Sequence, residues 1–339
     1  MRCDTISLHQ PCGGSVPDRV TIRVIQGDAL HHPATVLVLK HAQALYGVDK
    51  IVVSLLRQRG VEIDGRLPRA GATLLVESNG AVAARYVLFV GVPPLGRFDY
   101  AEIRGFSTLA FEALKEHGDA HQIVMTLHGR GFGLDETEAF KAEVAGIVDA
   151  LRNRTAPVQF QEISILELDE QTADRLRTVL ADLLPSSGGS TGIDIWRYRS
   201  GVVPTALRDV GARSREKPHI FVAMPFAAEF DDRFHYGIRN AANAAGYLCE
   251  RADLASFTGD VIAWVRDRID KASLVVADLS SANPNVYLEV GYAWGRGVRT
   301  VLVVSSASEL RFNVRGQRCL MFTSIRQLEG LLTQELKNL

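Results

Sequence analysis

Short apolar runs alternate with longer amphipathic stretches along most of the chain. The runs are rich in β-branched residues and are typical of buried strands, whereas the longer stretches have the 3.6-residue spacing of helices. In the first half, this pattern predicts strands at 20–25, 35–40, 72–77, 85–92, 122–129 and 163–168. It predicts helices at 100–118, 135–153 and 169–184. Asp135 stands at the start of the second helix and is expected to cap it.

The second half repeats the alternation after a change in composition. Residues 185–192 read PSSGGSTG, a stretch that predicts a linker, and we extend this linker to residue 216. Beyond it, five strands that alternate with helices are predicted at 219–225, 247–253, 273–279, 299–305 and 318–323. Such an alternation predicts a doubly wound, parallel five-stranded sheet. We therefore expect an α/β protein with a flexible tail at 1–19 and domains at 20–184 and 217–339.

The composition of the chain argues against several classes of binding partner. The 339 residues include 38 Lys and Arg against 39 Asp and Glu, a balance that argues against electrostatic binding of nucleic acid or of a membrane surface. No apolar run approaches the roughly 20 residues that span a bilayer, and the first residues lack the apolar core of a secretory signal. The four cysteines are scattered, which predicts free thiols in a cytoplasmic protein and no metal site.

A group of polar residues follows the predicted strand 273–279. Asp278, Asn283, Asn285 and Glu289 come where a buried strand gives way to a helix, at the sheet edge where ligands bind in folds of this kind. With Asn285 as the N-cap, Glu289 would lie in the first helical turn, where the helix dipole favours an ionised carboxylate. Such a carboxylate suits attack on a sugar C1′ or stabilisation of an oxocarbenium ion. Many acidic residues in first helical turns only cap the helix, so a catalytic role and a capping role of Glu289 both stay open.

A second strand end, AMPF at 223–226, is expected beside this group. Pro225 and Phe226 would form an apolar wall for a flat base. Asp253 ends the neighbouring strand at the same edge, and His235 is expected at the surface of an amphipathic helix.

The stretches HIFVAMPF and VVADLSSANPNVYLEVGYAWG resemble the nucleoside 2-deoxyribosyltransferase-like superfamily over residues 217–339. The resemblance implies a flavodoxin-like domain in which Glu289 is the nucleophile at C1′ and Asp278 holds the base or the sugar. Asn283 stands where many members have a second aspartate, a departure from the pattern for deoxyribosyl transfer. The Asn-Pro-Asn form resembles a branch found in bacterial defence proteins and is similar to TIR domains, which cleave the nicotinamide–ribose bond of NAD.

The resemblance also implies a wider substrate site and contacts between subunits. The RFNV stretch at 311–314 resembles a loop that closes a site in a neighbouring subunit, so we expect a homo-oligomer. The predicted substrate-binding residues are Met224, Pro225, Phe226, Asp253, Asn283, Asn285, Trp294 and Asn313.

A glycine-rich loop in the first half forms a second candidate site. Gly129, Gly131 and Gly133, with Phe132 between them, join a strand to a helix, where backbone amides are able to approach an anion. Glycines are also common in tight turns that bind no ligand, so a purely structural role of this loop stays open. The loop resembles the diphosphate loop of macro domains over residues 20–184, and Gly47-Val48 resembles their Gly-Val segment. The asparagines and glycines of active macro domains are absent, so the resemblance implies nucleotide binding and not hydrolysis.

Together, these features predict a protein whose C-terminal domain cleaves an N-glycosidic bond, with NAD as the preferred substrate and no cofactor. The macro-like domain would bind a nucleotide signal and control this site, as in a bacterial anti-phage effector that works with a signal-producing enzyme. Two alternatives remain: a nucleotide sensor without catalysis, and a housekeeping nucleoside deoxyribosyltransferase or hydrolase.

Overall fold

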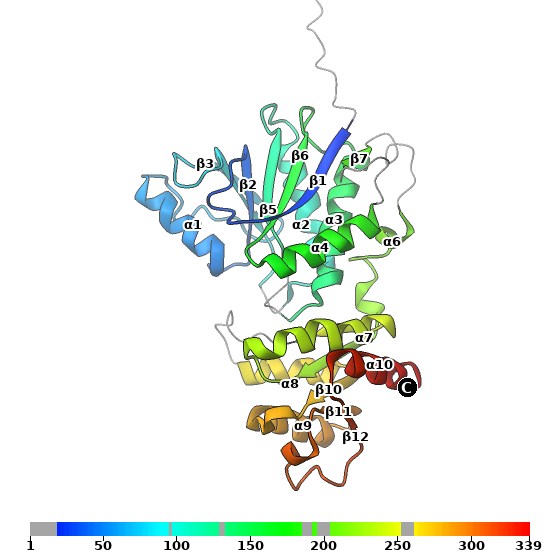
Figure 1. Cartoon of the computed structure of the whole chain (residues 1–339). Coiled ribbons are helices and arrows are strands. Elements are labelled where there is room, and N and C mark those ends of the chain that lie inside the picture. Colours follow the sequence, from blue (N-terminus) through cyan, green and yellow to red (C-terminus); the bar gives the residue numbers. More distant parts are fainter. Residues whose placement is uncertain (1–18, 95–96, 129–132, 185–191, 195–203, 252–260) are drawn as a thin grey trace, which may run out of the picture.

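The protein has two α/β domains, one after the other along the chain (Figure 1). The computed structural model describes residues 19–94, 97–128, 133–184, 192–194, 204–251 and 261–339. The predicted fold class, α/β with two sheets, is confirmed. No helix within these described ranges is both long enough and apolar enough to cross a membrane.

The N-terminal sheet has seven strands in the order β3-β4-β2-β5-β6-β1-β7. The strands are β1 (Arg19–Gln26), β2 (Val36–His41), β3 (Thr73–Glu77), β4 (Tyr86–Gly91), β5 (Gln122–Thr126), β6 (Glu162–Glu167) and β7 (Gly192–Asp194). The five inner strands are parallel, and the two edge strands, β3 and β7, run antiparallel to their neighbours. The carboxyl ends of the inner strands therefore share one edge of the sheet.

Helices cover both faces of this sheet. The four long helices are α1 (Gly47–Gln58), α2 (Tyr100–Leu114), α3 (Glu136–Arg152) and α4 (Glu170–Leu183). α2, α3 and α4 share one buried core with the sheet, and α1 packs in the core of the other face. An aspartate caps each of α2, α3 and α4 by accepting a hydrogen bond from a first-turn amide: Asp99, Asp135 and Asp169. The prediction that Asp135 caps α3 is confirmed.

The described part of the segment predicted as a linker packs on the N-terminal domain. Residues 192–194 form β7. The short helix α6 (Thr205–Arg208) places Leu207, which is fully buried, in the same core as α2 and α3. Arg104 of α2 donates hydrogen bonds to the carbonyl oxygens of Leu207, Arg208 and Val210. The covalent connection between the two domains is therefore short.

The C-terminal sheet has five parallel strands in the order β12-β11-β10-β8-β9. These are β8 (His219–Ala223), β9 (Leu248–Glu250), β10 (Leu274–Asp278), β11 (Thr300–Val304) and β12 (Cys319–Met321). The order is the flavodoxin-like one, in which the chain changes direction between the first and third strands, here β8 and β10. The predicted doubly wound five-stranded parallel sheet is confirmed.

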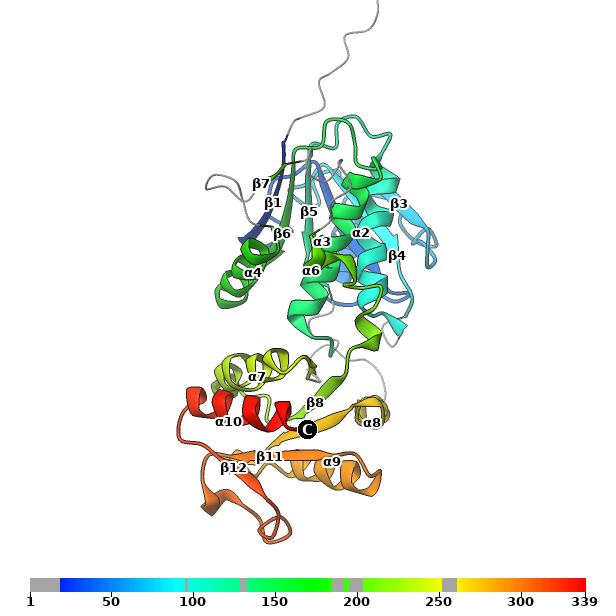
Figure 2. The same cartoon turned by 90° about the vertical axis from the view of Figure 1, so that its right-hand side faces the viewer.

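Two helical layers enclose this second sheet (Figure 2). A π-helix (Arg233–Arg239), α7 (Asn240–Ala244) and α10 (Ile325–Lys337) pack on one face. α8 (Val261–Lys271) and α9 (Pro284–Gly295) pack on the other. Two short 3-10 helices, Ser280–Ala282 and Ala307–Glu309, follow β10 and β11.

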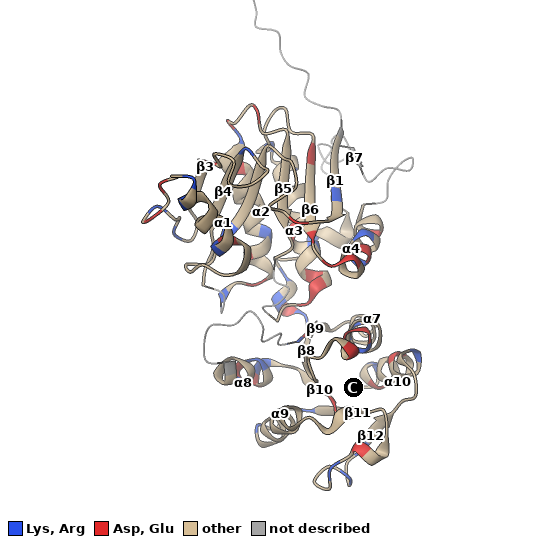
Figure 3. Ribbon diagram, turned by 60° about the vertical axis from the view of Figure 1, so that its left-hand side comes forward, with Lys and Arg blue, Asp and Glu red and all other residues tan. Residues whose placement is uncertain are grey.

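The acidic first turn of α3 is buried against the C-terminal domain (Figure 3). The two carboxylate oxygens of Asp135 bridge the domains, because Oδ1 caps the Glu138 amide and Oδ2 accepts from the Cys249 amide, each at 2.9 Å. The Tyr100 hydroxyl donates to Glu250 of β9 at 3.3 Å and accepts from the Asp135 amide at 2.9 Å. These polar groups, which lose water at the interface, are thus paired across it.

Glu136 forms the central ion pair of this interface. One carboxylate oxygen accepts from Arg239 of the π-helix at 2.5 Å, and Arg175 of α4 lies 3.3 Å from the same oxygen. Burial alone would raise the pKa of Glu136, but the charges of Arg239 and Arg175 outweigh burial and hold the pKa at about 2. His235 lies beside these arginines and is buried, so its predicted surface position is wrong. Burial and the two arginines lower the pKa of His235 to about 3, and the ring is neutral at pH 7.

We expect Glu136→Gln to lower the free energy of unfolding by about 3 kcal/mol at pH 7, because it leaves Arg239 buried without its partner charge. The loss is measured by urea denaturation, with Asp64→Asn as the control. Asp64 pairs with Arg57 at the exposed surface, so the control should change stability by about 1 kcal/mol or less. The contribution of Glu136 is complete above pH 4.5 and disappears as the pH falls toward 2, so the difference should shrink in acid. Equal effects of the two substitutions would contradict this account.

Candidate active site

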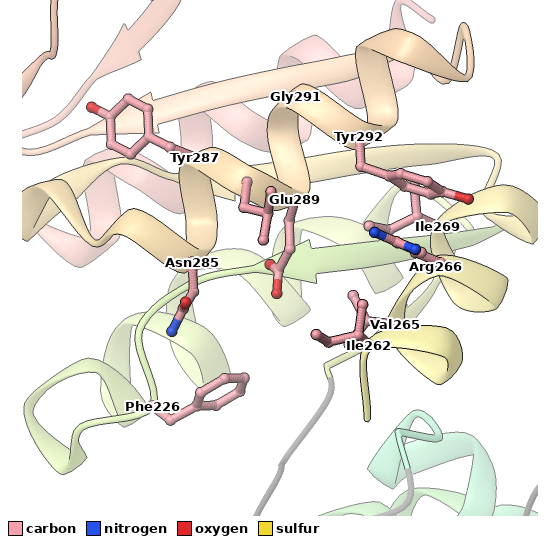
Figure 4. Close-up of a pocket in the computed structure, with 11 residues that line it drawn as sticks. Phe226, Ile262, Val265, Arg266, Ile269, Asn285, Tyr287, Glu289, Gly291 and Tyr292 are labelled. Atoms are coloured by element: carbon pink, nitrogen blue, oxygen red, sulfur yellow. The ribbon is translucent and has the colours of Figure 1, made fainter. Parts of the chain in front are cut away.

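A cavity of about 430 Å³ lies between α8, α9 and the loop after β8 (Figure 4). Most of its wall is apolar or aromatic. Its lining residues are Phe226, Ile262, Val265, Arg266, Ile269, Asn285, Tyr287, Leu288, Glu289, Gly291 and Tyr292. A concave, mainly apolar site with few polar groups is the usual form of a small-molecule site.

Glu289 is the acidic residue of this wall, and its carboxylate extends into the cavity (Figure 4). Burial raises the pKa of Glu289 to about 7. No cation of the described residues counteracts this effect, unlike the arginines beside Glu136. A carboxylate that titrates near neutral pH inside a cavity is typical of a residue with a chemical role.

The helix that carries Glu289 begins earlier than predicted. Asn283 is the N-cap of α9, because its side-chain oxygen accepts from the Asn285 amide at 2.9 Å, and Pro284 is the first helical residue. The prediction that Asn285 is the N-cap is therefore wrong. With Pro284 as the first residue, Glu289 is the sixth and lies beyond the free amides of the first turn. The expected stabilisation of its anion by the helix dipole is accordingly absent, and burial shifts the pKa in the opposite direction.

Asp278 lies on the other side of the sheet from this cavity. It ends β10 and is fully buried, with Oδ2 accepting from Arg233 at 2.8 Å and Oδ1 from the Ser280 amide at 3.0 Å. Successive side chains of a strand alternate between faces, and β10 residues Leu274 and Val276 pack in the core under α7 and α10. Asp278 points to that face, whereas Glu289 reaches the cavity from the face of α8 and α9.

Arg233, the partner of Asp278, is itself held by aromatic rings. Its guanidinium lies 4.9 Å from the ring centre of Phe230 and 5.0 Å from that of Phe322. Arg233 begins the π-helix, a rare element that occurs often near functional sites. The Asp278–Arg233 pair therefore anchors the end of the central strand β10 from beneath the sheet.

The other predicted substrate-binding residues lie in different places. Phe226 and Asn285 line the cavity with Glu289. Asn283 faces the amide that it caps. Met224 and Pro225 are buried. Trp294 is 39% exposed in the last turn of α9, and Asn313 is exposed in the turn after β11. Neither residue is among the described residues that line the cavity. Asp253 lies outside the described residues.

The wall formed by α8 was not recognised from the sequence. Ile262, Val265 and Ile269 have helical spacing, which equally predicts an ordinary core face, and Val265 and Ile269 are in fact buried. Arg266 and Tyr292 were also missed as site residues. Residues some twenty positions apart in sequence form one wall only because α8 and α9 pack on the same face of the sheet.

The residues predicted for the N-terminal site are only partly described. Gly129, Gly131 and Phe132 lie outside the described residues. Gly133 has φ +81°, and a Cβ atom there would lie 2.5 Å from the ring of Trp264 in α8. Gly47, with φ +55°, and Val48 begin α1 directly after the loop that follows β2. Across the described residues, no group of three or more His, Cys, Asp or Glu side chains has an arrangement for a metal ion.

No family model matches the sequence, and no curated protein matches it. Among solved structures, a macrodomain of Oceanobacillus iheyensis with MES bound covers 50% of this chain and 95% of its own, at 17% identity and a TM-score of 0.39. A Trypanosoma brucei macrodomain in complex with ADP covers 49% and 71%, at 15% identity and a TM-score of 0.39. The bottromycin maturation enzyme BotP covers 90% and 89%, at 16% identity and a TM-score of 0.30. Similarities of this size establish neither a family nor an activity for the chain.

We expect Glu289→Gln to stabilise the protein at pH 8.5 and to leave it unchanged at pH 4. The folded state binds a proton at Glu289 up to about pH 7 and the unfolded state only up to about pH 4.5, so wild type loses stability as the pH rises between these values. The gain at pH 8.5 should be about 1–2 kcal/mol, less than the full shift implies because Glu289 is partly exposed. Urea denaturation at both pH values, with exposed Glu229→Gln as the control, measures it. A gain of the same size at both pH values would refute the assignment.

Proposed function

We propose that the C-terminal domain cleaves the N-glycosidic bond of a nucleotide, with NAD as the preferred substrate and water as the acceptor. The observation that carries this proposal is a single carboxylate with a raised pKa, Glu289, inside a cavity of mainly apolar and aromatic walls. Glu289 is also the residue that the sequence resemblance gives as nucleophile. The ring of Phe226 lies in the wall of the cavity and gives a flat apolar surface for a base (Figure 4).

The proposed chemistry breaks the bond between C1′ of the ribose and the ring nitrogen of nicotinamide. The bonding electrons move to the pyridinium nitrogen, so the leaving group departs neutral and needs no general acid. The Glu289 carboxylate either bonds to C1′ or stabilises the oxocarbenium ion. Water then attacks C1′, displaces the Glu289 carboxylate where a bond to it has formed, and loses a proton to the solvent, which gives ADP-ribose. The positive charge of the bound substrate favours the ionised form of Glu289 and so opposes the effect of burial.

In this mechanism Asp278 and Asn283 position α9 and do not bind the sugar. The Asp278 side chain is fully buried and paired with Arg233, and Asn283 uses its side-chain oxygen as a cap. Asp278 therefore holds the strand end from which the chain enters α9, and Asn283 sets where α9 begins. Asn283 stands where the resemblance has a second aspartate for sugar hydroxyls, and this departure favours hydrolysis over deoxyribosyl transfer. The same observation favours the alternative of a nucleotide-binding protein without catalysis.

We further propose that the N-terminal domain binds a nucleotide signal and controls the cavity through α8. Trp264 of α8 lies against Gly133, the last residue of the glycine loop. On the same helix, Ile262, Val265 and Arg266 line the cavity of Glu289. A ligand that moved Gly133 would therefore shift a wall of the site. A protein that destroys NAD on a signal fits the role of a bacterial anti-phage effector.

Purified wild type should release nicotinamide from NAD, and Glu289→Gln should lose the activity by a factor of about 100 or more, because the substituted amide is a poor nucleophile. Base release is followed by chromatography over NAD and a panel of nucleosides, with and without ADP-ribose derivatives and cyclic nucleotides as signals. Glu229→Gln, exposed and outside the cavity, is the matched control. The wild-type rate should rise with pH through about 7 as Glu289 ionises. Tight binding of one ligand without base release would leave the sensor alternative.

Gly133→Ala should lower the rate of base release by about tenfold or more, because the added methyl group displaces Trp264 and with it the α8 wall. Gly105→Ala is the control, since Gly105 lies in α2 and has open space around it. It should stay within about twofold of wild type. If both variants keep the wild-type rate, or lose it together, control through α8 is excluded.

A further inference from the structure

Arg266 stands out in the cavity wall because its charge has no partner in the described part of the chain. It extends from α8 toward the same cavity as Glu289 (Figure 4). No described carboxylate lies within ion-pair distance of its guanidinium. The pKa of Glu289 is raised by burial alone, so Arg266 does not neutralise that carboxylate. Arg266 thus lines the same cavity as Glu289 without pairing with it, and no described carboxylate keeps its guanidinium from a ligand.

The acids that would normally pair with Arg266 are already engaged. Asp270, four residues further along α8, is the natural partner on a helix. Its Oδ1 accepts from Arg296 at 2.7 Å and its Oδ2 from the Tyr292 hydroxyl at 3.1 Å. Asp267, the neighbouring acid, pairs with Lys271 at 2.7 Å. α8 thus carries a cation at the cavity whose helical partners are occupied elsewhere.

Tyr292 gives Arg266 a fixed support. The Arg266 guanidinium lies 5.4 Å from the centre of the Tyr292 ring, within the range of a cation–π contact. The hydrogen bond from Tyr292 to Asp270 holds that ring, and Arg296 holds Asp270 in turn. A guanidinium stacked on a ring keeps its N–H groups at the edge free for hydrogen bonds in one plane.

We propose that Arg266 binds a phosphate of the substrate and thereby selects nucleotides over nucleosides. The planar guanidinium matches two phosphate oxygens and is able to bind them through two parallel hydrogen bonds. This inference rests on the proposed function, because it places the sugar beside Glu289 and the phosphate at the α8 wall of the same cavity. It assigns a specificity residue and a substrate class, 5′-phosphorylated nucleotides.

Equilibrium binding tests the assignment without reference to turnover. Nicotinamide mononucleotide and nicotinamide riboside differ only in the phosphate, and their dissociation constants are measured by calorimetry for the full chain, as wild type and as Glu289→Gln. The phosphorylated probe should bind about tenfold more tightly or better, and Arg266→Gln should remove this preference while riboside affinity stays within about twofold. Arg266→Lys should retain part of the preference. Arg326→Gln is the control, because Arg326 is exposed on α10, across the sheet.

The inference is overturned if no phosphorylated probe binds wild type more tightly than its riboside. It is also overturned if Arg266→Gln weakens both probes equally or neither. A phosphate preference without base release would remove the proposed hydrolysis and leave the assignment of Arg266. Base release without any preference for the phosphorylated probe would support the proposed hydrolysis and remove the assignment of Arg266.

Discussion

The arrangement of the two domains depends on one buried ionic contact, that of Glu136 with Arg239 and Arg175. This contact brings the first turn of α3 onto the π-helix of the second domain. With the bonds of Asp135 and Tyr100 beside it, it sets where β9 and α8 stand relative to the glycine turn at Gly133. The charges are acceptable in a buried place only as a complete set, because one unpaired member would lose its hydration without compensation.

Two glutamates of the chain, Glu136 buried and Glu289 partly exposed, show opposite pKa shifts. Arginines surround Glu136 and hold its pKa at about 2, so it stays ionised and links the domains. Glu289 has no such partner among the residues that the structure describes, and burial raises its pKa to about 7. Glu136 is matched with charge in the free protein, whereas in the proposed mechanism the substrate supplies the charge that matches Glu289. Arg266, which has no described carboxylate as a partner, extends this contrast to the other side of the same cavity.

The sequence predicts the helices and strands well and the arrangement of the site residues less well. Local periodicity located nearly every strand, and of the two predicted caps Asp135 is confirmed and Asn285 is wrong. Asp278 and Glu289 are close in sequence and were read as one group, but strand alternation sends Asp278 to the opposite face. His235 was placed at the surface because an amphipathic pattern cannot show that a second domain covers its polar side.

By itself, the sequence determined the α/β class, the parallel second sheet and the choice of Glu289 as the residue to test. The first two follow from local patterns, since strands, helices and their alternation are set by neighbouring residues, and the third follows from the sequence resemblance. Only the tertiary structure decided that α8 faces α9 across a cavity, that Asp270 is diverted from Arg266, and that burial raises the pKa of Glu289. Burial and charge pairing depend on which distant segments share a space, and no local pattern contains that information.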